Sequence, residues 1–432
     1  MKNARITIVY ELFRREGINI AILQRELQKR GYDVKIKNKY EQFSIEKNDV
    51  LIIPNAYFTA DIENYVYRFN CKSEKIINLQ VEQVFSKTDE QKKLWIAEGL
   101  AKNASFICWG NNRYQQMLNF GIDESNLKVC GALHTDSVKG IFYPLWKSRE
   151  EIATEFALPK DKKWTLFISS FGFTADDSPY LVFDVNVGKD GIKERIEMER
   201  ANQSAILQWF DDYLSTSSDV VIYRPHPTER NSSALKAIKE KYPDKFFVLS
   251  EYNIKQWIIV CDTITMWNST SIIECYYAGK NCLVLRPYNI PDDFDYYLFD
   301  DCVKVKNSEQ FVKAMKQYGD GFPITKEKLN EYYELTDAFV YLNICDEVER
   351  VLTTDKQQNL SNFFANRLKF FCKNHVLLKA FLKASYRWLN SKFGFELSES
   401  RLGGKFFTDE WKNLKKDRLE LEILQEKMKE II

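Results

Sequence analysis

Arg-Pro-His-Pro, at 224–227, contains the residue of this sequence whose setting most favours chemistry. The motif directly follows the apolar run 220–223, which predicts that His226 lies at the carboxyl end of a strand. Each proline fixes its own φ and biases the preceding residue toward extended backbone, so the imidazole is held rigidly. Beside Arg224, it can donate a hydrogen bond or a proton to a departing phosphate oxygen. Taken alone, such a motif is more often a turn without a function.

Four small polar residues form a second candidate site further along the chain. Asn268, Ser269, Thr270 and Ser271 separate an apolar run from a segment of helical composition. Serine and threonine cap helix N-termini, where unpaired backbone N–H groups attract anions. Capping needs only one such residue, so four in a row favour a phosphate-binding turn. Glu274, expected in the first turn of the helix, either favours the helix dipole or holds a ribose through both hydroxyls.

The order of these two motifs resembles that of GT-B transferases that use CMP-sugars, namely bacterial sialyltransferases, polysialyltransferases and Kdo transferases. Capsule-type polymerases that use CDP-glycerol carry a similar arrangement. In those families the histidine and the hydroxyl groups hold the nucleotide phosphate, and the glutamate holds the ribose. The resemblance implies a donor-nucleotide site made of His226, Ser269, Thr270, Ser271 and Glu274, to which we add the neighbouring Arg224 and Asn268.

The segment 164–180 resembles the "surface carbohydrate biosynthesis" proteins and the retaining β-Kdo transferases. In that family an aspartate of this loop attacks the anomeric carbon and forms a glycosyl-enzyme, which retains configuration. The resemblance implies that Asp176 is the nucleophile and Asp177 its substitute. The Asp/Glu-Asp/Glu-Gly motif of sialyltransferases is not matched, because Ala175-Asp176-Asp177 lacks the glycine. Kdo-like donors are therefore favoured, and an aspartate that only caps the following turn is the alternative.

A glutamine-rich segment follows an expected strand in the N-terminal half. In the same family such a segment faces the acceptor or the sugar, which implies contacts by Gln80 and Gln83. Glu82 is a candidate general base for the acceptor hydroxyl, although a single glutamate after a strand is usually only solvated. We expect His134, in the turn 131–136, to be structural.

Alternating strand-like and helix-like segments must position all these residues. The alternation runs through the first half and restarts after the polar stretch 158–164, which predicts two Rossmann-like units with parallel sheets. Ligands of such sheets bind beyond the carboxyl ends of the strands. We therefore predict the GT-B architecture with a central cleft and a C-terminal helical appendage. The expected parts are an acceptor domain (1–157), a donor domain (158–325), a closing helix (326–355, with the helical pattern over 327–352), and a basic amphipathic helical region for membrane association (356–432).

The region 356–432 differs in composition from the rest, since no acidic residue occurs between 356 and 395. A helix expected over 366–393 carries apolar residues, Phe370, Phe371 and Trp388 among them, on one face. Its other face carries Lys369, Lys373, Lys379, Lys383 and Arg387. An apolar face opposite cations is typical of a helix that lies in the surface of an anionic bilayer. The alternative is a basic helix docked on the protein's own core. His375 lies within this helix, and we expect no catalytic role for it.

Composition narrows the class of protein. A net charge of +1 gives no general attraction to nucleic acid. Nine scattered cysteines without a Cys-x-x-Cys pair predict reduced thiols in a cytosolic protein. The N-terminus does not have the pattern of a signal peptide, and no apolar run reaches the roughly 18 residues that span a bilayer. No His/Cys cluster has metal-ligand spacing, so we expect neither a metal nor another cofactor.

These observations predict a glycosyltransferase of the cytoplasm, peripheral on the inner face of the cytoplasmic membrane. It is expected to move Kdo or a related ulosonic acid from a CMP-activated donor to a lipid-linked surface glycan. Three alternatives share the scaffold: a CDP-glycerol or CDP-ribitol phosphotransferase, a sialyltransferase, and a UDP- or GDP-sugar transferase or epimerase. A non-catalytic scaffold of envelope assembly, which binds no nucleotide, is a fourth.

Overall fold

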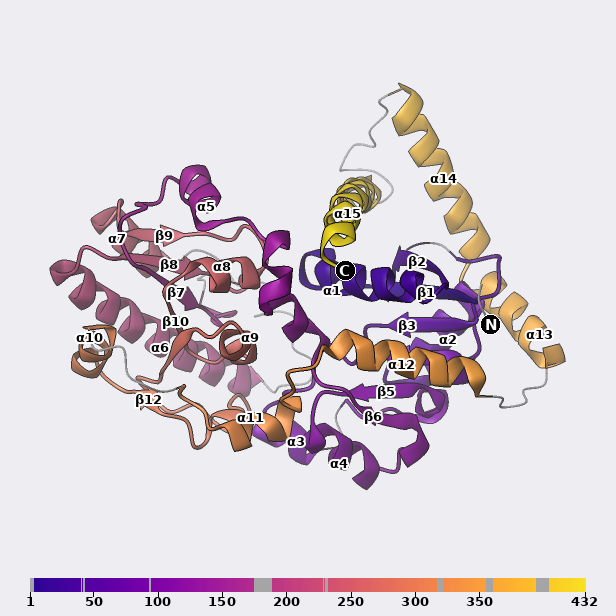
Figure 1. Cartoon of the computed structure of the whole chain (residues 1–432), viewed down its shortest axis with the longest axis horizontal. Helices are drawn as coiled ribbons and strands as arrows, with labels where there is room; N and C mark the ends of the chain where they lie inside the picture. The colour runs from indigo at the N-terminus through magenta and orange to yellow at the C-terminus, as the bar shows by residue number, and fades with distance from the viewer. Residues whose placement is uncertain are drawn as a thin grey trace. The chain divides into compact units, whose positions relative to one another are not determined.

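The computed structural model divides by its contacts into two compact units (Figure 1). It describes residues 4–39, 41, 43–92, 95–174, 189–227, 229, 232–316, 322–354, 360–393 and 404–432. The first unit comprises Met1–Gln83, Trp95–Ser137 and Tyr333–Ile432, and the second comprises Val84–Leu94 and Val138–Tyr332. The C-terminal helices thus belong by their contacts to the first unit. The domain boundaries proposed from the sequence, at 157, 325 and 355, remain predictions.

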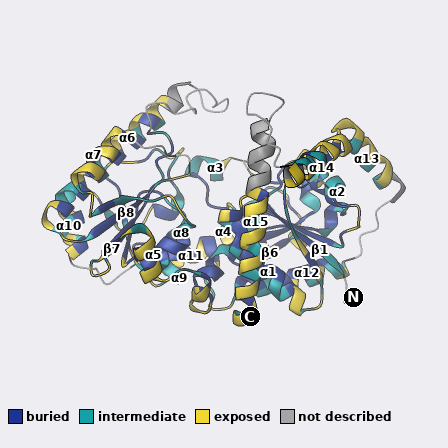
Figure 2. Ribbon diagram, turned by 90° about the horizontal axis from the view of Figure 1, so that it is seen from above, coloured by how far each residue is buried: buried dark blue, intermediate teal, exposed yellow. Residues whose placement is uncertain are grey.

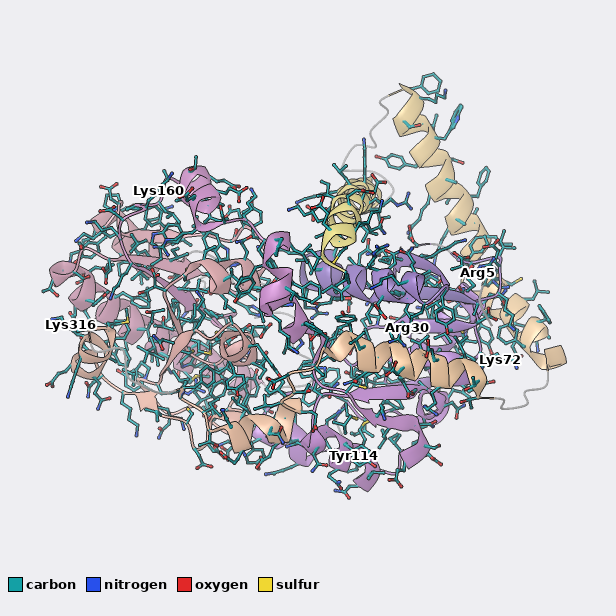
Figure 3. The ribbon with its side chains drawn as sticks, in the orientation of Figure 1. Arg5, Arg30, Lys72, Tyr114, Lys160 and Lys316 are labelled. Carbon is teal, nitrogen blue, oxygen red and sulfur yellow. The ribbon has the colours of Figure 1, made fainter. Side chains whose placement is uncertain are left out.

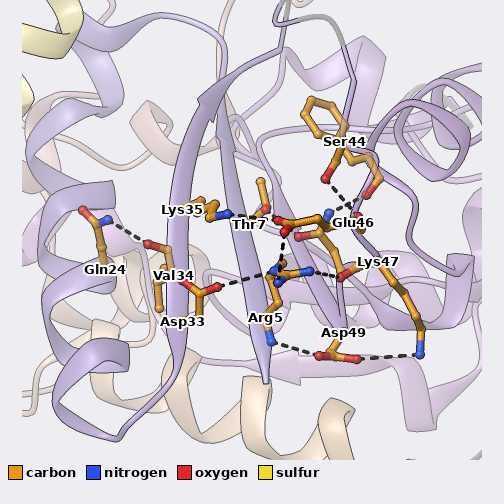
Figure 4. Close-up of polar contacts among 12 residues, drawn as sticks. Arg5, Thr7, Gln24, Asp33, Val34, Lys35, Ser44, Glu46, Lys47 and Asp49 are labelled. Carbon is orange, nitrogen blue, oxygen red and sulfur yellow. Dashed lines mark hydrogen bonds and ion pairs between the residues drawn. The ribbon is translucent and has the colours of Figure 1, made fainter. Parts of the chain in front are cut away.

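The first unit is built on a parallel six-stranded sheet with the order β2-β1-β3-β4-β5-β6. Its strands are β1 (Arg5–Tyr10), β2 (Asp33–Asn38), β3 (Val50–Ile53), β4 (Ile76–Asn78), β5 (Ser105–Cys108) and β6 (Leu127–Val129). β3 is buried along its whole length, as expected for a central strand covered on both faces. At the amino end of β1, Arg5 contacts Asp49 at 2.9 Å through its backbone amide and Asp33 at 3.4 Å through its guanidinium (Figure 4).

The second unit contains another parallel six-stranded sheet, with the order β12-β11-β10-β7-β8-β9. Its strands are β7 (Trp164–Ile168), β8 (Val220–Arg224), β9 (Phe246–Val248), β10 (Thr263–Met266), β11 (Asn281–Leu285) and β12 (Lys304–Val305). Aromatic side chains of β7, β8 and the helix that follows β7 form the centre of its core, and Figure 2 shows both sheets as buried. The order places β10, β7 and β8 side by side, so their carboxyl ends meet at one edge of the sheet.

Helices connect the strands in both units, which confirms the predicted class of two Rossmann-like units with C-terminal helices. The first unit has α1 (Phe13–Lys29), α2 (Thr59–Phe69), α4 (Asn111–Asn119), α12 (Val340–Thr353), α13 (Leu360–Lys373), α14 (Val376–Phe393) and α15 (Gly404–Ile431). The second has α3 (Lys87–Gln91), α5 (Arg149–Phe156), α6 (Lys189–Thr216), α7 (Ser233–Lys241), α8 (Ile254–Val260), α9 (Ile272–Tyr277), α10 (Ser308–Lys316) and α11 (Lys326–Tyr333). Short 3-10 turns are η1 (Ser73–Lys75), η2 (Gly99–Asn103), η3 (Glu124–Asn126), η4 (Leu133–Val138), η5 (Gly140–Leu145) and η7 (Tyr297–Phe299).

The single helix predicted over 327–352 is wrong, because the chain forms α11 and α12 with a break between them. Glu334 in the break has a φ of 40°, which no helix accommodates. The break lets Asp136 reach the start of α12, where its carboxylate accepts the backbone amides of Val340 at 3.0 Å and Tyr341 at 2.8 Å. At the other end, Lys75 Nζ donates to three backbone carbonyls, including that of Val351 at 2.6 Å. α12 is therefore fixed at both ends.

Asp136→Ala is expected to lower the free energy of unfolding by about 2 kcal/mol, because two helix N–H groups lose a charged acceptor. Urea unfolding followed by circular dichroism measures this change. Asp346→Ala is a matched control on α12, since Asp346 is 68% exposed and pairs only at the surface with Arg30, labelled in Figure 3. Equal destabilisation by the two substitutions would contradict a capping role for Asp136.

The continuous helix predicted over 366–393 is also interrupted, and α13 and α14 meet at a break where His375 has a φ of 51°. The left-handed backbone of His375 ends α13, and in its last turn the Asn374 side chain and backbone amide both donate to the Phe370 carbonyl at 3.0 Å. α15 instead packs along α1, with Met428 buried and Asp417 bound by the Tyr10 hydroxyl at 2.9 Å. None of the helices in the described ranges is long and apolar enough to cross a membrane.

Candidate active site

The Arg-Pro-His-Pro turn lies where the sequence predicts it, directly after β8. Arg224, the last residue of that strand, is buried, and its Nη2 donates to the Tyr252 carbonyl at 3.0 Å. His226 is exposed to solvent. Desolvation by neighbouring atoms, together with the positive charges of Arg195 and Arg224, lowers the pKa of His226 from its ordinary 6.5. The imidazole is therefore neutral at pH 7 and able to accept a proton.

Glu229 holds this turn in place and is absent from the residues predicted from the sequence. Its carboxylate accepts the backbone amide of His226 at 3.0 Å and the Tyr223 hydroxyl at 2.6 Å. The Ser169 hydroxyl donates to it at 2.5 Å and the Gln203 amide at 2.9 Å. Burial raises the pKa of Glu229 to about 7, although the hydrogen bonds from Ser169 and Tyr223 oppose the rise.

The partners of Glu229 come from separate elements, which is why the sequence does not reveal this residue. Ser169 follows β7, Tyr223 lies in β8 and Gln203 lies on α6. The hydroxyl of Ser232, which caps α7, extends the network by donating to Gln203 Oε1 at 3.2 Å. The only local signal is an acidic residue close behind the proline-flanked histidine. The turn is therefore attached to two strands and two helices.

The Asn-Ser-Thr-Ser stretch follows β10 as predicted and leads into α9. Ser269, Thr270 and Ser271 are partly exposed, and Ser269 Oγ accepts the backbone amide of Ser271 at 3.3 Å. The helix has only 6 residues, so its dipole is weaker than the sequence suggests. The Ser170 hydroxyl donates to the Asn268 carbonyl at 2.7 Å and joins the ends of β7 and β10. The structure thus brings this stretch to the same sheet edge as His226.

We expected the side chain of Asn268 to contact the nucleotide. Instead, it forms hydrogen bonds within the protein. Its amide donates to the Phe294 carbonyl at 2.8 Å, and its Oδ1 accepts Nη2 of Arg286 at 2.9 Å. Asp295 binds the same Arg286 atom at 3.0 Å and belongs to an Asp-x-Asp triplet, Asp293-Phe294-Asp295. Such triplets bind metals in other transferases, but here the arginine neutralises Asp295. The described residues contain no group of three or more His, Cys, Asp or Glu side chains arranged to hold a metal.

Glu274 lies in the first turn of α9, as expected, but it is buried. Burial raises its pKa to about 7, and the positive charge of Lys255, which is also buried, opposes the shift. Contact with a ribose therefore requires that a carboxylate oxygen become accessible.

Asp176 and Asp177 lie outside the described residues, so their roles remain predictions. The described chain before them ends β7 at Ile168 and continues to Thr174. Phe173 is anchored there by its backbone amide, which donates to Glu199 on α6 at 2.8 Å. The described chain therefore leaves the sheet edge that carries His226 and ends at Thr174, just before the two aspartates in the sequence.

In the first unit, the predicted acceptor residues follow β4 but differ in exposure. Gln83 is buried, with Nε2 donating to the Ile107 carbonyl at 2.7 Å and Oε1 accepting the Trp109 amide at 2.8 Å. It ties the loop to the end of β5, so its role is structural rather than the predicted contact with the acceptor. Glu82 is exposed and pairs with an arginine of α1 at 2.6 Å. Gln80 is buried and has a φ of 45°.

The cations predicted to face a membrane lie on α13 and α14. Lys369, Lys373 and Lys379 are exposed and Lys383 is partly exposed, while the side chain of Arg387 lies outside the described set. α14 turns its apolar face outward, with six exposed side chains: Leu377 (57%), Leu378 (56%), Phe381 (69%), Leu382 (49%), Trp388 (56%) and Phe393 (71%). In Figure 3 the side chains of this helix project away from the rest of the first unit.

α13 differs from α14 and corrects part of the membrane prediction. Phe370 packs against Tyr67 with ring centroids 5.4 Å apart, and Phe371 packs against Phe43 at 5.6 Å. Arg367 on the same helix donates to the Tyr67 carbonyl at 2.8 Å. Both phenylalanines, which we expected on the membrane face, therefore dock α13 on the first unit.

Comparisons with known proteins place this geometry among related folds. No protein-family model matches the chain. A stretch of 242 residues, 54% of the chain, is 25% identical to "Teichoic acid poly(ribitol-phosphate) polymerase" of Bacillus spizizenii. The match spans 33% of that relative's length.

Two solved structures are similar over most of the chain. UDP-GlcNAc 2-epimerase from Methanocaldococcus jannaschii has a TM-score of 0.54 at 13% identity, covering 80% of this chain and 99% of that chain. The wall teichoic acid polymerase TagF has a TM-score of 0.52 at 12% identity, covering 82% and 89%. The chain therefore has a GT-B-like fold, and at these identities the likeness concerns the fold alone.

Proposed function

We propose that this chain transfers glycerol phosphate or ribitol phosphate from a CDP-activated donor to an envelope polymer. The observation that carries the proposal is His226, an exposed imidazole of lowered pKa that is fixed at the carboxyl edge of the second sheet. The sequence similarity to a poly(ribitol-phosphate) polymerase supports this alternative over CMP-Kdo transfer, our main interpretation of the sequence.

In this reaction His226 acts as the general base. Its neutral imidazole accepts the proton of the acceptor hydroxyl while that oxygen attacks the donor phosphorus. The new P–O bond forms as the bond to the leaving CMP breaks, and no covalent enzyme intermediate is needed. The positive charges of Arg195 and Arg224 favour the charge that gathers on the phosphate oxygens. The rate is expected to fall as His226 is protonated, with a midpoint below pH 6.5.

Calorimetric titration with CDP, CMP, UDP and GDP, followed by transfer assays, tests the proposal. We expect wild type to prefer CDP and to use CDP-glycerol or CDP-ribitol. His226→Ala is expected to transfer at least about a hundredfold more slowly, since it removes the base. Asp176→Asn should retain activity, because this reaction uses no nucleophilic aspartate. His375→Ala is the matched control, since His375 lies at the break between α13 and α14.

Each other outcome overturns the proposal in a defined way. Preference for CMP, with transfer from CMP-Kdo that Asp176→Asn abolishes, would support a retaining Kdo transferase. Preference for UDP or GDP would support a nucleotide-sugar transferase or an epimerase. Binding of no nucleotide at all would support the non-catalytic scaffold.

We also propose that α14 lies in the surface of an anionic membrane and brings the active site to a membrane-linked acceptor. The support is the outward apolar face of α14 together with the exposed Lys369, Lys373 and Lys379. Water-exposed aromatic rings on one helix face are costly unless they are covered, and lysines beside them attract anionic headgroups. This arrangement suits an enzyme on the inner face of the cytoplasmic membrane.

A further inference from the structure

We infer that the carboxyl edge of the first sheet carries an acceptor subsite in which Trp95 stacks on a hydroxyl-rich polyol or sugar chain. The residues that form it, here called the Trp95 cluster, are Tyr57, Gln80, Trp95 and Arg113. Tyr57 follows β3, Gln80 follows β4 and Arg113 lies on α4, which follows β5. Ligands of parallel α/β sheets bind at this edge. The inference rests on the proposed function for the identity of the acceptor.

Trp95 is exposed and yet held firmly. The residue is 46% exposed, and its backbone has a φ of 60°, which is unfavourable for a bulky residue. Arg113, itself buried, fixes this conformation by donating from Nη2 to the Trp95 carbonyl at 2.5 Å. The indole meets the Tyr57 ring edge-on, with centroids 5.4 Å apart. A tryptophan needed only for the core would be buried, so this rigid, accessible indole fits a stacking surface.

Gln80 adds a polar group, its side-chain Nε2, that has no partner among the described residues. It has no exposed surface and a φ of 45°, and its Oε1 accepts Nε of Arg113 at 3.3 Å. Among the described residues, none accepts a hydrogen bond from its Nε2. A buried amide without an acceptor costs free energy, and two left-handed residues bound to one arginine add strain. Both features are explained if a ligand hydroxyl accepts the Gln80 amide, which requires that Nε2 become accessible when the ligand binds.

The surroundings favour a hydroxyl-rich chain as the occupant. The C–H groups of a polyol or sugar pack on an indole face, which carries negative charge density. Burial raises the pKa of Tyr57 to about 12, so its hydroxyl stays neutral, and it donates to Asn55 at 3.2 Å. Glu82 and Arg15 form a 2.6 Å ion pair close enough to influence this tyrosine. When a polymer phosphate displaces Glu82, Arg15 can bind it, which matches an acceptor whose units are joined by phosphate.

Binding of synthetic glycerol phosphate and ribitol phosphate oligomers, measured by calorimetry without a donor, tests the subsite. Trp95→Ala is expected to weaken binding about tenfold, and Trp95→Phe to restore most of it, because a phenyl ring still stacks. Phe364→Ala is the matched control, since Phe364 is another exposed aromatic residue of the first unit, with 64% exposure, and lies on α13 outside the cluster. Circular dichroism of each variant establishes that it is folded, and Trp95→Phe keeps the test valid should the alanine variant unfold.

The test separates the subsite from the proposed function. CDP binding is measured in parallel and is expected to be unchanged by Trp95→Ala, because the donor site lies in the second unit. Wild-type affinity of Trp95→Ala for the oligomers, or an equal loss in Phe364→Ala, would overturn the subsite even when CDP binds. Loss of oligomer binding in Trp95→Ala supports the subsite even if the nucleotide preference proves different from that proposed.

Discussion

Glu229→Gln is expected to reduce transfer by about tenfold to a hundredfold while leaving the protein folded. The Glu229 carboxylate accepts two N–H groups, from His226 and Gln203, on its two different oxygens. A glutamine amide has only one acceptor oxygen, so one of these N–H groups loses its acceptor. The hydroxyls of Ser169 and Tyr223 can rotate to accept, whereas the N–H groups cannot. The variant therefore loses the hydrogen bond from either His226 or Gln203, and the imidazole of the turn shifts. A displacement of about 1 Å costs up to a hundredfold in rate.

The pH dependence distinguishes a positioning role for Glu229 from a merely structural one. Its pKa is about 7, so in wild type the carboxylate is protonated as the pH falls through 7, and the rate should decline there. Glu229→Gln removes this step and leaves only the titration of His226, below pH 6.5. Rates measured from pH 5 to 9 therefore test the assignment. Glu197→Gln, a 68% exposed position on α6, is the matched control and should follow the wild-type profile.

The contribution of Glu229 to the free energy of unfolding should fall as the pH rises. The contribution of an ordinary carboxylate in an ion pair rises with pH. Because burial raises the pKa of Glu229 from 4.5 to about 7, the folded state binds a proton more tightly than the unfolded state. The wild type therefore loses stability as the pH rises from 4.5 to 7, by at most about 3 kcal/mol from this group. Glu229→Gln should not show this part of the decrease in the free energy of unfolding, because glutamine does not titrate. Parallel unfolding curves of wild type and variant across this range would contradict the raised pKa.

Long apolar runs allowed the sequence to predict the parallel sheets and the strand-end positions of His226 and Ser269. These features depend on local composition and on the rule that ligands bind at carboxyl edges. His134, expected to be structural, packs against Trp109 with ring centroids 4.7 Å apart. Contacts between side chains that are distant in the sequence could not be predicted in this way. The role of Glu229 depends on partners after β7, on β8 and on α6. The start of α12 after the break at Glu334 depends on the carboxylate of Asp136, which is distant in the sequence.

The solvent exposure of individual side chains could not be predicted either, because it depends on contacts with segments distant in the sequence. Gln83 and Asn268 have the composition of site residues, yet their amides bind carbonyl groups of distant segments. Trp95 looks like an ordinary core residue in the sequence, and only its left-handed backbone and its exposure make it a candidate. Polar residues at strand ends therefore locate the edge of a site, whereas tertiary packing decides which of them a ligand can reach.

Phe381→Ser combined with Trp388→Ser is expected to weaken binding to phosphatidylglycerol vesicles by about a hundredfold or more. These two residues of α14 are 69% and 56% exposed, and burial of each side chain in the acyl boundary contributes about 1.5–3 kcal/mol. Vesicle sedimentation measures the change. Cys372 is exposed and the other eight cysteines are buried, so a fluorophore attached at Cys372 reports on the same surface.

The matched control is Leu419→Ser with Ile423→Ser, which removes two exposed apolar side chains from α15. That helix carries Glu420 and Glu422 between them, so it should not enter an anionic surface, and vesicle binding should be unchanged. Replacing Lys369, Lys373 and Lys379 by glutamine should weaken binding by about 1 kcal/mol each on anionic vesicles, and less in high salt.

Stability in solution separates a membrane helix from one docked on the protein. If Phe381 and Trp388 belonged to a core, their loss would cost about 3–5 kcal/mol each, whereas replacement of exposed rings should change the free energy of unfolding little. Point substitutions are sharper here than removal of 356–432, because α15 packs on α1 and its loss would disturb the first unit. Vesicle binding that persists in the double variant, or marked destabilisation without vesicles, would contradict the membrane role. Loss of vesicle binding at unchanged stability would instead place this protein at the membrane surface, where the proposed acceptor would be linked.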